Sequence, residues 1–364
     1  MPDARTPVWG VAQPQVFKKD VGAAVDILSD ILQNSSLDAA AVERERSVIL
    51  REMEEVEKEP EEVLFDHLHA TAFQFTSLGR PILGPAANVR SITRDDLATY
   101  IATHYTAQRM VLVGAGAVEH EALVKLAAGA FGGLRSDSTT AASLCAASPV
   151  AFTGSEVRMR DDDMAAAHVA IGFKGASWKD PDSVPLMVMQ AMLGAWDKHH
   201  AGGVNLGSPL AQRLAANELA DSYMAFNTNY NDCGLFGVHA VSSNTEHLDD
   251  MAWAIMKDVA LLAYDVNEED LLRAKEQLKS SLLLHVEGGS SAVAEDIGRQ
   301  LLTYGRRVPR AEMFARIDAV TPEAVKAAGR RFITDKDIAV AAMGPTQFLP
   351  EYNWWQRHTY MLRY

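Results

Sequence analysis

Apolar residues recur along the chain with two different spacings. In residues 21–33 and 248–264 they return at every third or fourth position, which is typical of an amphipathic helix. Short runs of strand-forming residues occur instead at 110–116, 156–160 and 168–173. Helices and strands are therefore both expected, and the pattern predicts an α/β fold.

The chain contains an internal repeat of one structural unit. A helix capped by Thr93 precedes the strand at 110–116, and a helix capped by Thr321 precedes another strand at 338–344. Thr321 follows Thr93 by 228 positions, and the same interval separates the two strands. Pro322 stands at the first helical position of the second copy, where its missing N–H does no harm. A repeat of this length predicts two similar α/β domains.

A stretch rich in Ser, Thr and Ala at 136–148 separates the two copies. We therefore expect a first domain at 16–135, a linker at 136–152 and a second domain at 153–364. Residues 1–15 are expected to be an unrelated N-terminal stretch.

The two copies are unequal in length. In the second, several strand signals precede the helix at 248–264, among them a hairpin-like pair at 217–229 and 234–241. In the first, only 20 residues precede the helix at 21–33. The first domain is therefore expected to lack its opening strands and helix.

The segment 42–56 places two acids where an amphipathic helix should be apolar. Glu45 and Glu52 are seven residues apart, which puts them two turns apart on the side that also carries Ile49 and Val56. A carboxylate in an apolar stripe is costly unless it is paired, hydrogen-bonded or bound to a metal. A buried ion pair and a metal site are both consistent with this spacing.

The internal repeat bears on these acids. Residues 44–46 correspond to residues 273–275, so that Ala274 and Ser281 stand where the first copy has its two acids. Because the second copy keeps the helix without the acids, the fold does not require them. This comparison favours a site, and leaves the ion pair open.

The composition of the chain indicates which classes of partner it can bind and which redox compartment it occupies. The net charge of −14 argues against nucleic acid and anionic membranes and favours basic partners. No apolar run approaches the ~18 residues that a membrane-spanning helix needs. The two cysteines, Cys145 and Cys233, fit neither a metal nor a disulfide framework, which indicates a reducing compartment.

Several long strings resemble a known family. Residues 16–21, 44–57, 65–73, 78–85 and 104–107 are similar to the family of mitochondrial processing peptidase β subunits and core subunit one of the cytochrome bc1 complex. The similarity runs from the first of these strings to the C-terminus. It implies an α/β fold of the α+β type, with two duplicated domains that are each a mainly antiparallel sheet flanked by helices, the second domain being non-catalytic. It also implies a mitochondrial location, in the matrix or on the matrix side of the inner membrane.

The resemblance also implies roles for four acids. In this family a His-x-x-Glu-His motif supplies two zinc ligands and the general base, and a downstream helix supplies a third ligand. That ligand falls on Glu52, and Glu45 matches a supporting acid. Glu62 and Asp66, four apart on one helical face, would bind the arginine near the cleavage site of a basic presequence. An exposed acidic face is the alternative interpretation of this second pair.

The chain departs from the family in one respect. None of its eleven histidines completes a His-x-x-Glu-His motif, so the general base is absent and the zinc site is incomplete. Three interpretations follow. The first is the β subunit of a zinc metalloendopeptidase, which removes basic presequences together with an α subunit. Without the motif, this chain would be inactive. The second is a scaffold subunit of the bc1 complex, beside core subunit two. The third is an acidic protein that binds basic peptides. The retained acids favour the first.

Overall fold

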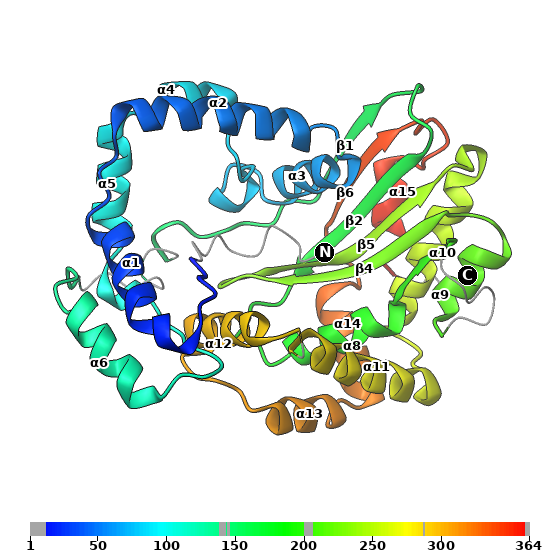
Figure 1. Cartoon of the computed structure of the whole chain (residues 1–364). Coiled ribbons are helices and arrows are strands. Elements are labelled where there is room, and N and C mark those ends of the chain that lie inside the picture. Colours follow the sequence, from blue (N-terminus) through cyan, green and yellow to red (C-terminus); the bar gives the residue numbers. More distant parts are fainter. Residues whose placement is uncertain (1–11, 138–142, 144–145, 200–206, 287, 361–364) are drawn as a thin grey trace. The chain divides into compact units, whose positions relative to one another are not determined.

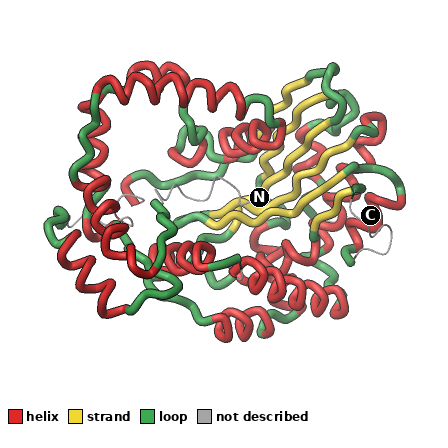
Figure 2. Tube along the Cα trace, viewed as in Figure 1, coloured by secondary structure: helices red, strands yellow, loops and turns green. Residues whose placement is uncertain are grey.

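The computed structural model describes residues 12–137, 143, 146–199, 207–286 and 288–360 (Figures 1 and 2). Its chain divides into two compact units. The helical unit comprises Met1–Glu54, Leu83–Ser148 and Leu282–Val308. The sheet unit comprises Glu55–Ile82, Pro149–Ser281 and Pro309–Tyr364. Both units are therefore built from segments that are far apart in the sequence.

All strands of the described chain form one sheet in the sheet unit, with the order β1-β6-β2-β5-β4-β3. Only β1 and β6 pair in parallel, and the other pairs are antiparallel. The expected mainly antiparallel sheet with flanking helices is thus confirmed for this unit. The strand bounds are β1 Ser155–Arg160, β2 Ala167–Gly175, β3 Ala195–Asp197, β4 Ser222–Asn229, β5 Gly234–Ser242 and β6 Ile338–Gly344.

Helix α3 (Pro60–Ala72) covers one face of this sheet. Its apolar residues Leu64 and Leu68 are completely buried, and they join a core with Ala170 of β2 and Ala341 of β6. Small residues on the strands let the helix approach closely: a Cβ added at Gly172 would meet the side chains of Leu235 and Leu68. Burial of a leucine side chain contributes about 1.5–3 kcal/mol, so α3 is anchored by its apolar stripe.

Other helices cover the opposite face. Helix α8 (Ser183–Leu193) lies on β4, where the Gln190 side chain donates to the Ala225 carbonyl over 3.0 Å. Helix α14 (Pro322–Phe332) packs against α8 and β2. Figure 1 shows α3 on one side of the strands and α8 and α14 on the other. The remaining helices of this unit are α9 Pro209–Ala216, α10 Leu248–Leu261, the greater part of α11 Glu268–Val286, α13 Arg310–Asp318 and α15 Tyr352–Arg357.

The helical unit buries much less of its surface. The described helices of this unit include α1 Val21–Gln33, most of α2 Ala39–Val56, α4 Ala86–Ser91, α5 Arg94–His104, α6 His120–Phe131 and α12 Ser290–Tyr304. No residue of α2, α5 or α6 is buried. Helix α1 packs on α6, and the Ser29 hydroxyl donates to the Ala130 carbonyl over 2.7 Å.

The strand expected at 110–116 does not form, so that prediction was wrong. The segment has no regular secondary structure, and Gly116 lies in a bend. A strand needs neighbouring backbone N–H and C=O groups to pair with, and among the described residues no second strand lies in the helical unit. Residues 110–116 therefore have the apolar pattern of a strand but do not form one.

The sequence repeat recurs as a repeated contact. In α2, Arg46 donates to the carbonyl groups of Val89 and Ile92 at the end of α4. In α11, the matching residue Lys275 donates to the Asp318 carbonyl at the end of α13 over 3.0 Å. Each cation thus satisfies carbonyl groups that a helix leaves unpaired at its C-terminus. This equivalence supports the duplication.

The caps expected for the next helices are also present. The Thr93 hydroxyl accepts from the Asp96 N–H, and the Thr321 hydroxyl accepts from the Ala324 N–H, each over 3.2 Å. Asp96 completes a capping box at the first of these helices.

The domain bounds expected from the sequence stay a prediction. Helix α3 belongs to the compact unit that holds the sheet, although it precedes the expected linker in the sequence. Residues 1–11, most of the stretch 138–145 and Cys145 lie outside the described residues. None of the described helices is long and apolar enough to cross a membrane.

Replacing Leu68 by alanine should destabilise the sheet unit by about 2–5 kcal/mol, because it opens a cavity under α3. Urea unfolding followed by circular dichroism measures this change. Leu272→Ala, at a position on α11 that is 60% exposed, is the matched control. It should change the free energy of unfolding by less than about 0.5 kcal/mol. Equal effects of the two variants would contradict the packing described for α3.

Candidate functional site

Helix α2 carries both acids of the predicted zinc site, and both are exposed. The helix begins where the Asp38 carboxylate accepts from the N–H groups of Ala40 and Ala41, over 2.8 and 3.0 Å. Neither Glu45 nor Glu52 has a hydrogen-bond or ion-pair partner among the described residues. The expectation that these carboxylates face a core was wrong, since the helix has no buried residue.

The residues present do not fit a zinc ion. A catalytic zinc site needs three protein ligands around an open fourth position. The described residues contain no group of three or more His, Cys, Asp or Glu side chains that could hold a metal. Glu45 and Glu52 share one exposed helix, and no histidine joins them. We therefore derive no chemical step through zinc from these residues, and their assigned roles stay predictions.

The second predicted pair lies on α3 in the sheet unit. Glu62 is exposed in the first turn, where the positive end of the helix dipole favours an acid. Asp66 is half-buried one turn further along. Because apolar residues fix α3 on the sheet, the two carboxylates are held at a set spacing on a rigid element. Both also interact with other groups of the chain.

The structure brings the predicted residues together only in part. Glu45 and Glu52 share α2 in the helical unit, whereas Glu62 and Asp66 share α3 in the sheet unit. The two acids of each pair lie on one helix, as their spacing in the sequence predicted. The metal-site role and the substrate role both stay predictions.

Sequence reasoning missed a pocket of about 410 Å³ on the sheet face that also carries α3. Residues paired across antiparallel strands share a face. Asp197, Ser222, Val241 and His168 therefore form one row across four strands. The adjacent row is formed by Ala195, Met224 and His239. Glu61 of α3, Trp196 and Tyr223 also line the pocket.

Two histidines line this pocket, of which His239 is buried and His168 half-buried. The rings of His168 and His239 stack with their centroids 6.0 Å apart. Burial lowers the pKa of His239 to about 3, and the neighbouring His168 adds to the shift. Burial likewise lowers the pKa of His168. Both imidazoles are therefore neutral at neutral pH. The two residues are 71 positions apart in sequence, so only the strand register reveals them as neighbours.

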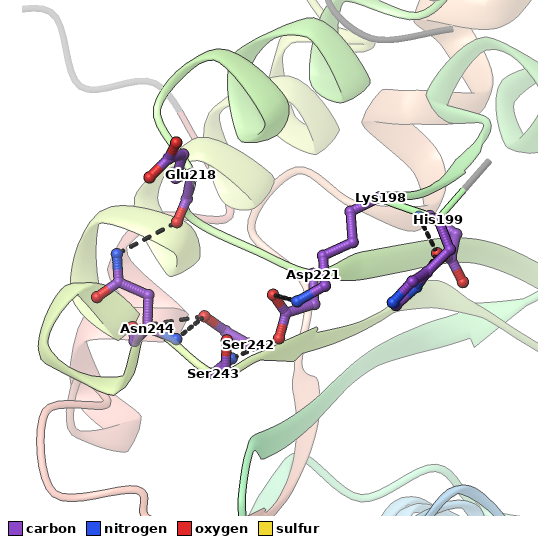
Figure 3. Close-up of polar contacts among 8 residues, drawn as sticks. Lys198, His199, Glu218, Asp221, Ser242, Ser243 and Asn244 are labelled. Atoms are coloured by element: carbon purple, nitrogen blue, oxygen red, sulfur yellow. Dashed lines mark hydrogen bonds and ion pairs between the residues drawn. The ribbon is translucent and has the colours of Figure 1, made fainter. Parts of the chain in front are cut away.

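Ion pairs hold the strand ends beside this pocket (Figure 3). The Lys198 ammonium lies 2.5 Å from the Asp221 carboxylate, which also accepts from the Ser243 N–H over 2.8 Å. Although partial burial acts to raise the pKa of Asp221, these hydrogen bonds lower it overall. His199 contacts Asp197 over 2.9 Å. These contacts join the end of β3 to β4 and to the residues that follow β5.

Family models match most of the chain. The model of the insulinase family, peptidase family M16, matches residues 11–86. The model described as the peptidase M16 inactive domain matches residues 91–278. Each match includes residues of both units, and together they extend from residue 11 to residue 278.

Curated relatives are similar over nearly the whole chain. A probable mitochondrial-processing peptidase subunit beta of Arabidopsis thaliana is 59% identical over 96% of this chain and 66% of its own length. The corresponding subunit of Lentinula edodes is 48% identical over 92% of the chain and 72% of its own length. The subunit of Bos taurus is 47% identical over 93% of the chain and 68% of its own length. The chain thus spans about two thirds of the length of these relatives.

A solved structure has the same fold. A chain of complex III2 from Candida albicans, with Inz-5 bound, matches with a TM-score of 0.87 and 25% sequence identity. The match covers 95% of this chain and 82% of that one.

Replacing Glu52 by glutamine should leave zinc binding unchanged, because its carboxylate is exposed and belongs to no metal-binding group among the residues that the structure describes. Both proteins should hold well under one zinc per chain after dialysis, as measured by inductively coupled plasma mass spectrometry. Glu246→Gln, which removes an exposed acid elsewhere, controls for the charge change. Stoichiometric zinc on the unaltered chain that Glu52→Gln abolishes would contradict the misfit described above.

Replacing His239 by glutamine should flatten the acid side of the stability profile. The unfolded side chain takes up a proton near pH 6.5, whereas the folded one does so only near pH 3. The unfolded state therefore binds more protons between these values, and stability falls as the pH falls, by up to ~1.4 kcal/mol per pH unit. Urea unfolding at pH 7, 6 and 5 measures the slope. The exposed His247→Gln variant should keep the pH dependence of stability of the unaltered protein. An equal pH dependence in both variants would contradict the effect attributed to His239.

Proposed function

The chain belongs to peptidase family M16, whose inactive-domain model alone matches over half of its length, and we propose that it is a β-type subunit of a mitochondrial processing peptidase that binds basic presequences. The observation that carries the proposal is the pair Glu62 and Asp66 on the anchored helix α3. The protein is mitochondrial, as its resemblance to the family implied.

Carboxylates on one helix face are suited to an arginine of a presequence. A guanidinium group presents several N–H donors in a plane, and it pairs with carboxylates through charge-assisted hydrogen bonds. Glu62 and Asp66 stand one turn apart, so they offer acceptors along the path of an extended basic peptide. The net charge of −14 attracts such a peptide from a distance.

Binding, rather than hydrolysis, is the step that the residues present support. Peptidases of this family depend on zinc, which activates the water that attacks the peptide bond. Among this chain's residues, Glu52 would be one zinc ligand and Glu45 its supporting acid. The described residues contain no metal-binding group around them, and the sequence contains no His-x-x-Glu-His motif. The proposed role is therefore recognition of the presequence, in a heterodimer with an α-type subunit.

One observation favours a second candidate function. The match to a chain of complex III2 covers 95% of this chain, as the peptidase matches nearly do, at 25% sequence identity. A scaffold subunit of the bc1 complex, placed beside core subunit two, would use the same fold without binding a presequence. The two functions differ in whether Glu62 and Asp66 bind a ligand.

Replacing both Glu62 and Asp66 by their amides should weaken presequence binding about tenfold or more, because charge-assisted hydrogen bonds contribute about 1.5–3 kcal/mol each. Fluorescence anisotropy of a labelled basic presequence, with the α-type subunit present, measures the affinity. The Glu246→Gln variant should bind nearly as the unaltered chain does. A presequence whose arginines are replaced by citrulline should bind weakly to every variant.

Failure to bind any presequence, together with stable assembly into complex III, would support the scaffold function instead. Binding that is equally strong in the double variant would remove the role proposed for α3.

A further inference from the structure

The pocket beside the N-terminus of α3 contains polar atoms that the chain itself leaves unsatisfied. His239 is only 5% exposed, and its Nε2 atom has no hydrogen-bond partner within the described structure. The Nδ1 atom of His168, whose ring stacks on that of His239, is likewise buried and unpaired. An unsatisfied buried polar group costs about 1–3 kcal/mol. A ligand that pairs with these atoms would recover that free energy.

The protonation of His239 defines the partner that it lacks. Its Nδ1 atom lies 3.9 Å from a carboxylate oxygen of Glu61. A neutral imidazole has one donor and one acceptor nitrogen. The negative charge of the Glu61 carboxylate favours the proton on Nδ1, the nitrogen nearer to it, and this tautomer leaves Nε2 as an acceptor. The ligand must therefore bring a hydrogen-bond donor.

The rest of the lining defines the charge and shape of the ligand. Two carboxylates, Glu61 and Asp197, stand at the pocket, and their side chains are 59% and 40% exposed. Ala195, Met224 and Val241 supply an apolar surface between them. A volume of about 410 Å³ is within the usual range of ligand pockets, about 300–1,000 Å³. Acids at the rim, apolar walls and neutral acceptors suit a cation on an aliphatic stem.

We propose that this pocket binds the guanidinium side chain of a basic peptide, at a site separate from the pair Glu62 and Asp66. The guanidinium would donate to the Glu61 carboxylate and to the Nε2 atom of His239, while its methylene stem lies against Met224 and Val241 and Asp197 adds negative charge at the rim. The inference rests on the proposed function only for its natural ligand, a basic presequence. The recognition chemistry depends on the pocket alone.

Other classes of ligand fit these residues less well. An anion would meet two carboxylates and two neutral imidazoles, and the unpaired Trp196 N–H would offer it a donor but no compensating charge. A metal ion needs several converging ligands. The two histidines and two acids of the pocket do not form a group of three or more that could hold one. Arginine is preferred to lysine because its planar fork reaches several acceptors at once.

Titration of the whole chain with N-acetyl-arginine amide tests the inference without any peptide cleavage. Chain labelled with ¹³C at histidine Cε1 gives one resonance for each histidine, and His168→Gln and His239→Gln variants assign the two that matter. Both resonances should shift saturably with the arginine probe. N-acetyl-citrulline amide, a neutral isostere, should cause no saturable shift.

Variants of the acids locate the binding. Glu61→Gln should weaken binding of the arginine probe about five- to tenfold, and Asp197→Asn should weaken it in the same direction. Glu246→Gln, which removes an exposed acid outside the pocket, should leave the affinity unchanged. The variant with both Glu62 and Asp66 replaced should also keep its affinity for the probe. If it loses the presequence but keeps the probe, both proposals stand.

Three results would overturn the inference. The first is an equal response to the arginine and citrulline probes, and the second is an equal loss of affinity in Glu61→Gln and Glu246→Gln. The third is a response of the two histidines to zinc at far lower concentration than to arginine amide, which would identify a metal site. A chain that fails to bind presequences yet binds the arginine probe would refute the proposed function and retain the pocket.

Discussion

The packing of α3 against the sheet is the interaction on which the functional residues depend. Leu64 and Leu68 are completely buried against β2 and β6, and this contact fixes the direction and rotation of the helix. Pro60 is the first residue of the helix, where its fixed φ angle favours the helical conformation of the first turn. Glu61, Glu62 and Asp66 gain their positions from this contact, because a short helix without it would be only marginally stable.

A sheet requires paired backbones, and this requirement separates the two units. In the sheet unit, β6 lies between β1 and β2 and is almost fully buried. Its sequence counterpart at 110–116 has a similar apolar pattern but no neighbouring strand among the described residues. The matching helices differ in the same way. Ala274 of α11 is completely buried, whereas Glu45, which occupies the equivalent place in α2, is exposed.

The sequence predicted local structure well wherever its signals were local. Helix α1 has the expected bounds, and the caps at Thr93 and Thr321 form as predicted. The strand at 110–116 could not be excluded from its own residues, because pairing depends on distant segments. The histidine pocket was invisible for the same reason. His168 and His239 become neighbours only through the register of β2 and β5, which no short motif encodes.

Adjacent acids on α3 have different surroundings because successive residues of a helix are about 100° apart around its axis. Glu61 turns toward the sheet, within 3.9 Å of His239, and contributes to the pocket. Glu62 does not line the pocket and shares its helical face with Asp66 instead. A rotation of the helix by one residue would exchange these roles, and it would also turn Leu64 and Leu68 away from the strands. The apolar stripe of α3 therefore sets the direction of its acids as firmly as it holds the helix to the sheet.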